Sequence, residues 1–147
     1  MDDLKINMGQ RFKDMLDDLR KKKYKTVDIT GPWLEGIAKR IDADPKSVPS
    51  SSVVDSLSAY HEYEQSKVTT ALKSRHYNAL SRTNQNDIID GEQLVYLADE
   101  RLCLITGDTG IERRVKNSPQ LSRIITATPA QLQDAKQASA LIKSITH

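Results

Sequence analysis

The sequence has few of the residues that mark several specialised classes of protein. It contains a single cysteine, Cys103, so no disulfide can form within the chain, and this thiol lies in an apolar run that predicts burial. The histidines, His61, His76 and His147, are scattered, and no Cys/His pair has the spacing of a zinc site. These shortages exclude a disulfide scaffold and a zinc-binding domain, and they favour a reducing, cytoplasmic setting.

Long apolar runs and targeting signals are also missing. No apolar run approaches the ~20 residues of a membrane-spanning helix, and the first residues, 1–5, show no signal-peptide pattern. The single tryptophan, Trp33, lies on an expected apolar helix stripe, and one such ring makes a poor platform for stacking on nucleic-acid bases. We therefore expect no membrane partner and a place in the core for Trp33.

The composition that remains is typical of a globular chain. The 147 residues are 37% hydrophobic and 29% charged, with a formal net charge of +2, which fits one domain with its own core. Basic residues gather on both sides of an acidic motif: Lys73, Arg75, His76 and Arg82 precede it, and Arg113, Arg114 and Lys116 follow it. A carboxylate centre with basic flanks suits a polyanionic substrate, and the alternative for each basic cluster is a solvated helix surface.

The first half of the chain has the apolar spacing of helices. This spacing predicts a helix over about 8–22, a second from Thr30 to a stop at Asp44-Pro45, and a long third helix over about 52–80. The third helix contains Val68-Thr69-Thr70, where β-branched residues weaken helix propensity and a break is expected. The first half is therefore predicted to be helical only.

The second half alternates between helix and strand. Asn86 or Asp87 is expected to cap a helix, and the run from Arg101 to Thr106 reads as a buried strand. A short helix follows through Val115, then a second strand at 124–125 and a final helix from Thr128-Pro129. This alternation predicts an α/β fold with parallel strands and right-handed crossovers.

Three aspartates are the candidate functional residues. Asp87 and Asp90 lie one turn apart on the expected helix, and Asp108 follows the carboxyl end of the first strand, where α/β sheets place their chemistry. Because carboxylates that converge are unfavourable without a cation, this pattern predicts a site for a divalent metal ion. The alternative is that Asp87 is a helix N-cap, Asp90 a first-turn acid and Asp108 a turn residue.

From about Val53 onward the sequence resembles the PIN-like nuclease family. Residues 86–97 are similar to the helix that carries the middle acid of that family, residues 102–108 to the following strand with its Thr-x-Asp ending, and residues 124–126 to the last strand. The resemblance implies one PIN-like domain over 1–147, with three α/β/α layers and a small parallel sheet. It also implies metal-dependent hydrolysis of RNA.

The resemblance also implies a set of site residues. Mg²⁺ or Mn²⁺ would be held by Asp87, Asp90 and Asp108, and a glutamate from the preceding helix would join them in catalysis. Glu64 is the preferred glutamate, with Glu62 and, more weakly, Asp55 as the alternatives. Thr106 and Thr109 flank Asp108, and their hydroxyls either orient the carboxylate or serve as strand-end and helix-cap groups; both readings stay open.

The sequence departs from the family at its N-terminus. The family begins with an apolar strand that ends in an acid, and here Asp28 is the only stand-in for that acid. The simplest explanation is a fragment that lacks the first strand, and the alternative is a divergent member with an incomplete site.

These departures leave the activity open. An incomplete PIN-like domain would act without catalysis in RNA or protein binding, and a third alternative is an unrelated helical α/β module in which the aspartates are caps only. A missing central strand would also expose a sheet edge, which predicts a homodimer through that edge or filling of the gap by another element.

Overall fold

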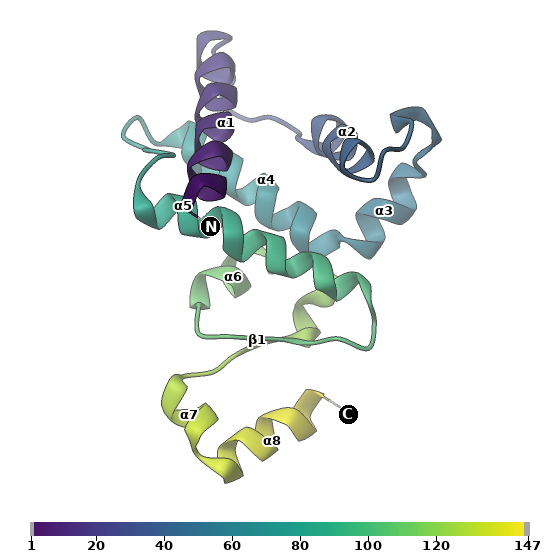
Figure 1. Cartoon of the computed structure of the whole chain (residues 1–147), viewed down its shortest axis with the longest axis vertical. Coiled ribbons are helices and arrows are strands. Elements are labelled where there is room, and N and C mark those ends of the chain that lie inside the picture. The colour runs from purple at the N-terminus through teal and green to yellow at the C-terminus, as the bar shows by residue number, and fades with distance from the viewer. Residues whose placement is uncertain (1, 146–147) are drawn as a thin grey trace.

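The computed structural model describes residues 2–145, with side chains from 3 to 144, and it is mostly helical with one small sheet (Figure 1). The first half contains α1 (Asp2–Lys21), α2 (Thr30–Arg40), the 3-10 turn η1 (Pro45–Ser47), α3 (Ser50–Ser56) and α4 (Ser58–Lys73). The second half contains α5 (Arg82–Gln93), η2 (Leu94–Ala98), β1 (Leu104–Thr106), α6 (Thr109–Arg114), η3 (Pro119–Arg123), β2 (Ile124–Thr126), α7 (Pro129–Gln133) and α8 (Ala135–Ile145).

The first helix is longer at its start than its apolar spacing predicts. It begins at Asp2 rather than near residue 8, because its N-terminal part packs on α5. Gly9 is buried at this crossing, where an added Cβ would come within 3.3 Å of the Ala79 carbonyl oxygen and the Gln85 side chain. Close packing of two helices therefore fixes the first turns of α1.

The long helix predicted over 52–80 is two helices. The chain bends at Leu57 (φ −117°, ψ 29°), which separates α3 from α4, and Val68 stays within α4, where it is buried. The second helix ends at Lys73, because the Arg20 guanidinium donates to the carbonyls of Ala71 and Ser74 at 3.0 and 2.9 Å. The break expected at residues 68–70 was wrong, since packing outweighs the weak helix propensity there.

The core is built around α4. Its Ala59, Tyr60 and Tyr63 are buried against Leu94 and Leu97 of η2. Ile111 and Val115, within and just after α6, and Ile124 of β2 complete the same cluster. The helical half and the α/β half of the chain therefore share one hydrophobic core.

The two strands form the parallel pair that the alternation predicts. β1 and β2 pair in the register Leu104↔Ile124, Ile105↔Ile125 and Thr106↔Thr126. The strand is shorter than the predicted run from Arg101 to Thr106, because the Leu102 N–H bonds to the Asp99 carbonyl in a turn. A mixed α/β class with a small parallel sheet is confirmed.

Helices lie on both sides of this sheet. In Figure 1, α4, α5 and α6 lie on one side of β1, and α7 and α8 lie on the other. The predicted final helix breaks at Asp134, whose carboxylate accepts from the N–H groups of Lys136 and Gln137 and so starts a new helix. No helix in the described part of the chain is both long and apolar enough to cross a membrane.

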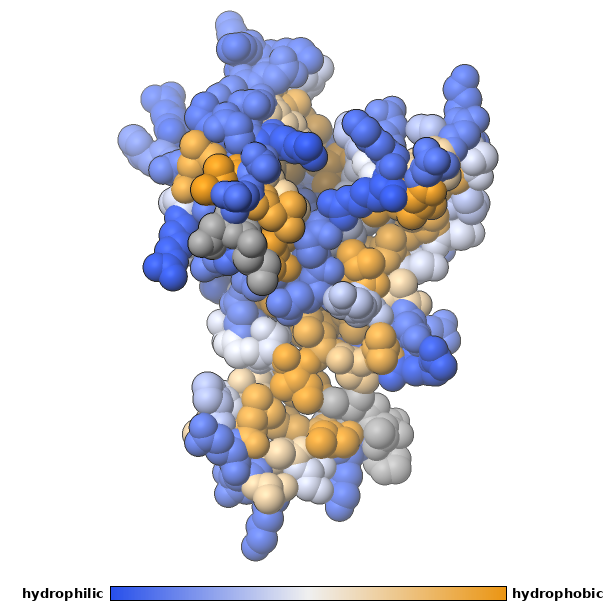
Figure 2. Space-filling model, viewed as in Figure 1, coloured by the Kyte–Doolittle hydropathy of each residue, from blue (hydrophilic) through white to orange (hydrophobic). Residues whose placement is uncertain are grey.

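One edge of β1 is open. In the sheet of the described residues, β1 has β2 as its only neighbour. Leu102 and Ile105 are 44% and 37% exposed, and Leu132 and Ile142 of the helices below are also exposed. Figure 2 shows the resulting apolar surface in the lower part of the molecule, where Figure 1 places β1, α7 and α8.

Candidate functional site

The helix α5 carries Asp87 and Asp90 in its interior. Ser81 is its N-cap, with a hydroxyl that accepts from the Asn84 N–H at 3.3 Å, so the helix begins at Arg82. The start predicted at Asn86 or Asp87 was therefore wrong. Asp87 is not an N-cap and Asp90 is not a first-turn acid, so helix capping does not account for either residue.

Asp108 lies two residues beyond the end of β1 and starts the next helix. Its Oδ1 accepts from the Gly110 N–H at 2.6 Å, which makes it the N-cap of α6, and its own N–H donates to the Thr106 hydroxyl at 3.1 Å. A Cβ on residue 110 would lie 2.9 Å from this carboxylate, so the turn favours glycine there. The alternative given for Asp108 was a turn residue, and the structure shows it in the turn after β1 as the N-cap of α6. The Thr106 hydroxyl accepts from the backbone N–H of Asp108 and does not contact the Asp108 carboxylate. Thr109 is exposed.

Arg114 joins the two segments that carry the aspartates. From the end of α6 its Nη2 donates to Asp87 Oδ2 at 2.9 Å and its Nη1 donates to the Tyr63 hydroxyl at 2.8 Å. The Tyr63 hydroxyl in turn donates to the Asp87 carbonyl at 2.9 Å, and the guanidinium lies 5.0 Å from the centre of the Tyr63 ring. This contact ties the end of α6, the helix that Asp108 begins, to Asp87 of α5.

Asp90 has no such partner. Its carboxylate makes no hydrogen bond and no ion pair with any residue that the structure describes. Burial raises the pKa of Asp90 above its ordinary value, the charges of Asp108 and Asp87 raise it further, and Lys5 and Arg114 oppose this shift. The three predicted aspartates are therefore close enough to interact, and the middle one is unpaired.

The donor oxygens suit a hard divalent cation, although they do not form a closed cage. Within the described residues, no group of three or more His, Cys, Asp and Glu side chains is placed to hold one metal ion. Asp90 has both oxygens available, Asp87 has Oδ1, and Asp108 has Oδ2. Since Mg²⁺ is often held by one or two carboxylates together with water and substrate phosphates, these residues fit such an ion.

Glu64, the glutamate preferred from the sequence, belongs to a different cluster. Its Oε1 accepts from the Lys67 ammonium at 2.7 Å, and the Lys67 side chain is only 3% exposed. Both residues line a cleft of about 370 Å³ between α1, α2, α4 and α5, which none of the three aspartates lines. A Cβ on Gly91 of α5 would lie 3.0 Å from Glu64 Oε1, so the two helices pack closely between this cluster and Asp90.

The remaining acidic candidates make contacts elsewhere. Glu62 accepts from the backbone and side chain of Asn117 at 3.1 and 2.8 Å. Asp28, the stand-in for the first family acid, accepts from the backbone and hydroxyl of Thr30, which lower its pKa. Asp55 lines a separate surface groove. None of these contacts links Glu62, Asp28 or Asp55 to the three aspartates.

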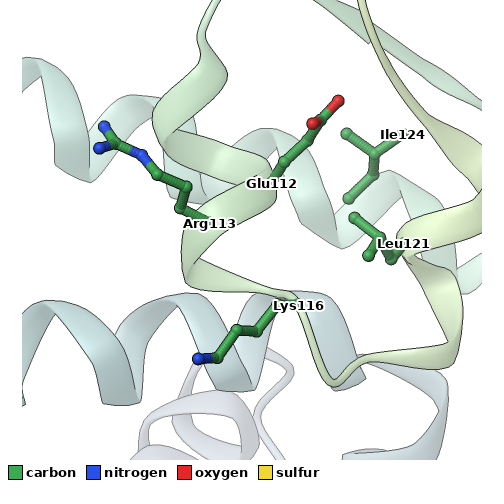
Figure 3. A pocket seen from close by; sticks show the side chains of 5 residues that line it. All are labelled: Glu112, Arg113, Lys116, Leu121 and Ile124. Atoms are coloured by element: carbon green, nitrogen blue, oxygen red, sulfur yellow. The ribbon is translucent and has the colours of Figure 1, made fainter.

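A larger open groove lies beside α6 and β2. It has a volume of about 680 Å³ and is lined by Glu112, Arg113, Lys116, Leu121 and Ile124 (Figure 3). Arg113 and Lys116 extend to one side of α6, and Glu112 extends to the other, toward Ile124. The Thr126 hydroxyl donates to Glu112, so the exposed positive charge of this groove comes from Arg113 and Lys116.

No specific feature of the sequence indicated the pairing of Arg114 with Asp87. Arg114 belongs to the basic cluster after the acidic motif, where three cations have similar surroundings in the sequence. Its distance from Asp87 depends on the packing of α6 against α4 and α5. The only available signal was its position on the helix that Asp108 begins.

Comparisons with known proteins add no relative to this description. No family model, no curated protein and no solved structure matches the chain. The resemblance to PIN-like nucleases therefore stays a prediction that rests on the residues quoted above.

Proposed function

We propose that the chain is a PIN-like domain that hydrolyses RNA phosphodiester bonds with a bound Mg²⁺ or Mn²⁺. The observation that carries this proposal is the unpaired Asp90 carboxylate, which interacts with the carboxylates of Asp87 and Asp108. Two of the three lie on α5 and the third follows β1, in the order that the family resemblance implies. Helices on both sides of a parallel sheet agree with the proposed three-layer α/β/α arrangement.

The aspartates and Arg114 have different roles in the proposed site. When bound, the ion supplies a Lewis acid that polarises the phosphate and activates a water molecule. Asp90 and Asp87 would hold the ion, and the bond from Arg114 to Asp87 Oδ2 fixes the direction in which Oδ1 points. Asp108 is held in one orientation by the bond from the Gly110 N–H to its Oδ1, and its Oδ2 accepts no hydrogen bond from a described residue. Such fixed orientation lowers the cost of assembling the site.

Cleavage of single-stranded RNA tests the proposal. The purified chain is incubated with labelled RNA in Mg²⁺, in Mn²⁺ and in EDTA, and the rate is compared for Asp90→Asn and Asp108→Asn. We expect each substitution to lower the rate on the order of 10²-fold, as loss of one charged contact in a transition state does. Asp14→Asn, an exposed carboxylate on α1, is the matched control. Metal-dependent cleavage that survives Asp90→Asn would reject the assigned site.

A second candidate function is a non-catalytic domain that binds RNA or protein. The observation that favours it is that two of the three carboxylates already have partners within the protein. Asp87 pairs with Arg114, and Asp108 caps the start of α6. Such a domain would bind Mn²⁺ weakly and leave RNA intact. Titration calorimetry with Mn²⁺ separates the two candidates, because tight stoichiometric binding that is lost in Asp90→Asn supports only the first.

A further inference from the structure

The geometry points to Arg114 as the residue that binds a backbone phosphate of RNA beside the three aspartates. This inference rests on the proposed function, because it names the group that receives the substrate at the same site. It adds a binding residue that the sequence did not single out. The support comes from the contacts of the guanidinium and from the charges around it.

Arg114 is anchored and still has donors to offer. A guanidinium carries five N–H donors, and the bonds to Asp87 and Tyr63 use one on Nη2 and one on Nη1. The Nε–H and the second N–H of each Nη have no partner among the described residues. The side chain is 26% exposed, so these donors belong to a group that is fixed by its contacts but still reached by solvent.

A phosphate that binds beside the three aspartates needs a cation to offset their negative charge, and Arg114 is placed to supply it. Asp87, Asp90 and Asp108 repel an anion, and Lys5, which bonds to Asn86 at 3.1 Å, is the other cation that acts on Asp90. A planar guanidinium can bind phosphate oxygens through two parallel N–H groups, which an ammonium cannot. Arg114 can therefore hold a phosphate on one side of the carboxylates without releasing Asp87.

The adjacent arginine offers a matched comparison. Arg113 has the same charge on the same helix, but it lines the open groove in Figure 3 and makes no hydrogen bond or ion pair with a described residue. Substitution of Arg113 removes one positive charge but leaves in place the Arg114 guanidinium, which is held by Asp87 and Tyr63. The two substitutions thus separate a specific phosphate contact from general attraction to a basic surface.

The test is RNA binding without a divalent ion. Fluorescence anisotropy measures the Kd of a labelled single-stranded RNA oligonucleotide in EDTA for the wild-type chain, Arg114→Gln, Arg114→Lys and Arg113→Gln. We expect Arg114→Gln to weaken binding about tenfold, and to lower the slope of log Kd against log salt by about 0.7, the value for one phosphate contact on a single strand. Arg114→Lys should lose nearly as much as Arg114→Gln, and Arg113→Gln less than about threefold.

Several outcomes would overturn the inference. Equal losses in Arg113→Gln and Arg114→Gln would show that only net charge matters, and wild-type binding that is absent or unchanged by Arg114→Gln would exclude the contact. Arg114→Lys keeps a charge beside Asp87, so it decides the question if Arg114→Gln unfolds, as judged by circular dichroism. Because cleavage is not measured, loss of the proposed hydrolysis and loss of this contact are seen separately.

Discussion

The two sides of α5 hold carboxylates in opposite circumstances. Asp90 and Glu92 are two positions apart, so they point to different sides of the helix. Glu92 accepts from Arg40 at 2.9 and 3.0 Å and from the Tyr60 hydroxyl at 2.8 Å. Burial acts to raise the pKa of Glu92, but the bonds from Arg40 and Tyr60 outweigh it and hold the pKa below its usual range.

Asp90 has neighbours of its own sign instead. Burial and the charges of Asp108 and Asp87 raise its pKa, and Lys5 and Arg114 oppose this shift only through their charges. No described residue donates a hydrogen bond to the Asp90 carboxylate. A partly buried carboxylate that accepts hydrogen bonds from cations stabilises the fold. One without such partners lowers the stability unless a cation binds beside it. The comparison therefore separates Glu64 and Glu92, whose carboxylates are paired within the protein, from Asp90, whose carboxylate has no hydrogen-bond or ion-pair partner among the described residues.

The largest effect on stability is expected from loss of the ion pair between Lys67 and Glu64. Lys67→Met removes a side chain that is only 3% exposed and leaves the partly buried Glu64 without its counter-ion. We expect a loss of about 3 kcal/mol in the free energy of unfolding, because breaking a buried pair strands the remaining charge. Urea unfolding measures this loss. The double variant Glu64→Gln/Lys67→Met should recover much of it, and a single-variant loss below about 1 kcal/mol would contradict the structural role.

The packing of α5 against α4 can be tested at Gly91. An added Cβ would lie 2.8 Å from the Tyr63 ring and 3.0 Å from Glu64 Oε1, so Gly91→Ala forces α4 and α5 apart. We expect it to cost about 1–3 kcal/mol of stability by overpacking. Gly36→Ala is the matched control, since nothing lies within 4 Å of its Cβ, and it should stabilise α2 by about 0.5–1 kcal/mol. Equal effects of the two substitutions in thermal unfolding would argue against this tight crossing.

The two carboxylates should respond to pH with opposite signs. Glu92 has a lowered pKa, so its contribution to stability is present above its ordinary value of 4.5 and is lost as the pH falls. Glu92→Gln should therefore be destabilised at neutral pH, by an amount that shrinks in acid. Asp90 has a raised pKa, so the native state is favoured at low pH and this advantage is lost as the pH rises above 3.8.

Asp90→Asn should accordingly be more stable than the wild-type chain at neutral pH, with a difference that closes toward pH 3.8. Urea unfolding midpoints of the wild-type chain, Glu92→Gln and Asp90→Asn, measured in EDTA between about pH 3.8 and neutral pH, give the pH dependence of both differences in stability. This effect is the smaller of the two, because Asp90 is reached by solvent and loses no partner. Destabilisation by Asp90→Asn at neutral pH would show that the carboxylate has a structural partner after all.

Local patterns predicted much of this arrangement. The parallel order of β1 and β2 followed from the apolar runs at 102–105 and 124–125, and the place of Asp108 beyond a strand end followed from the turn after it. Periodicity also located α2 at Thr30, because burial of one helix face leaves a regular trace in the sequence. These features depend on neighbours along the chain.

The parts that were missed depend on distant neighbours. The start of α5 at Arg82 is an exception, since its Ser81 cap is the preceding residue, in a polar stretch that looks like a loop. The end of α4 depends on Arg20, more than fifty positions away. Helical spacing places Lys67 one turn from Glu64, and the structure has this ion pair. The spacing does not show that the pair lines a cleft that none of the three aspartates lines, so Glu64 was assigned to the aspartates. The pairing of Arg114 with Asp87 likewise follows from how helices pack.

We expect the open edge of β1 to make the stability of the protein depend on its concentration. The Thr106 carbonyl accepts from the Ala127 N–H on the β2 side, so the backbone groups of Ile105 point to the other edge. We expect a second copy to pair there, as proposed from the sequence, and by mass action the unfolding temperature then rises as the protein is concentrated. Ile105→Lys should abolish that rise while leaving the dilute protein unchanged.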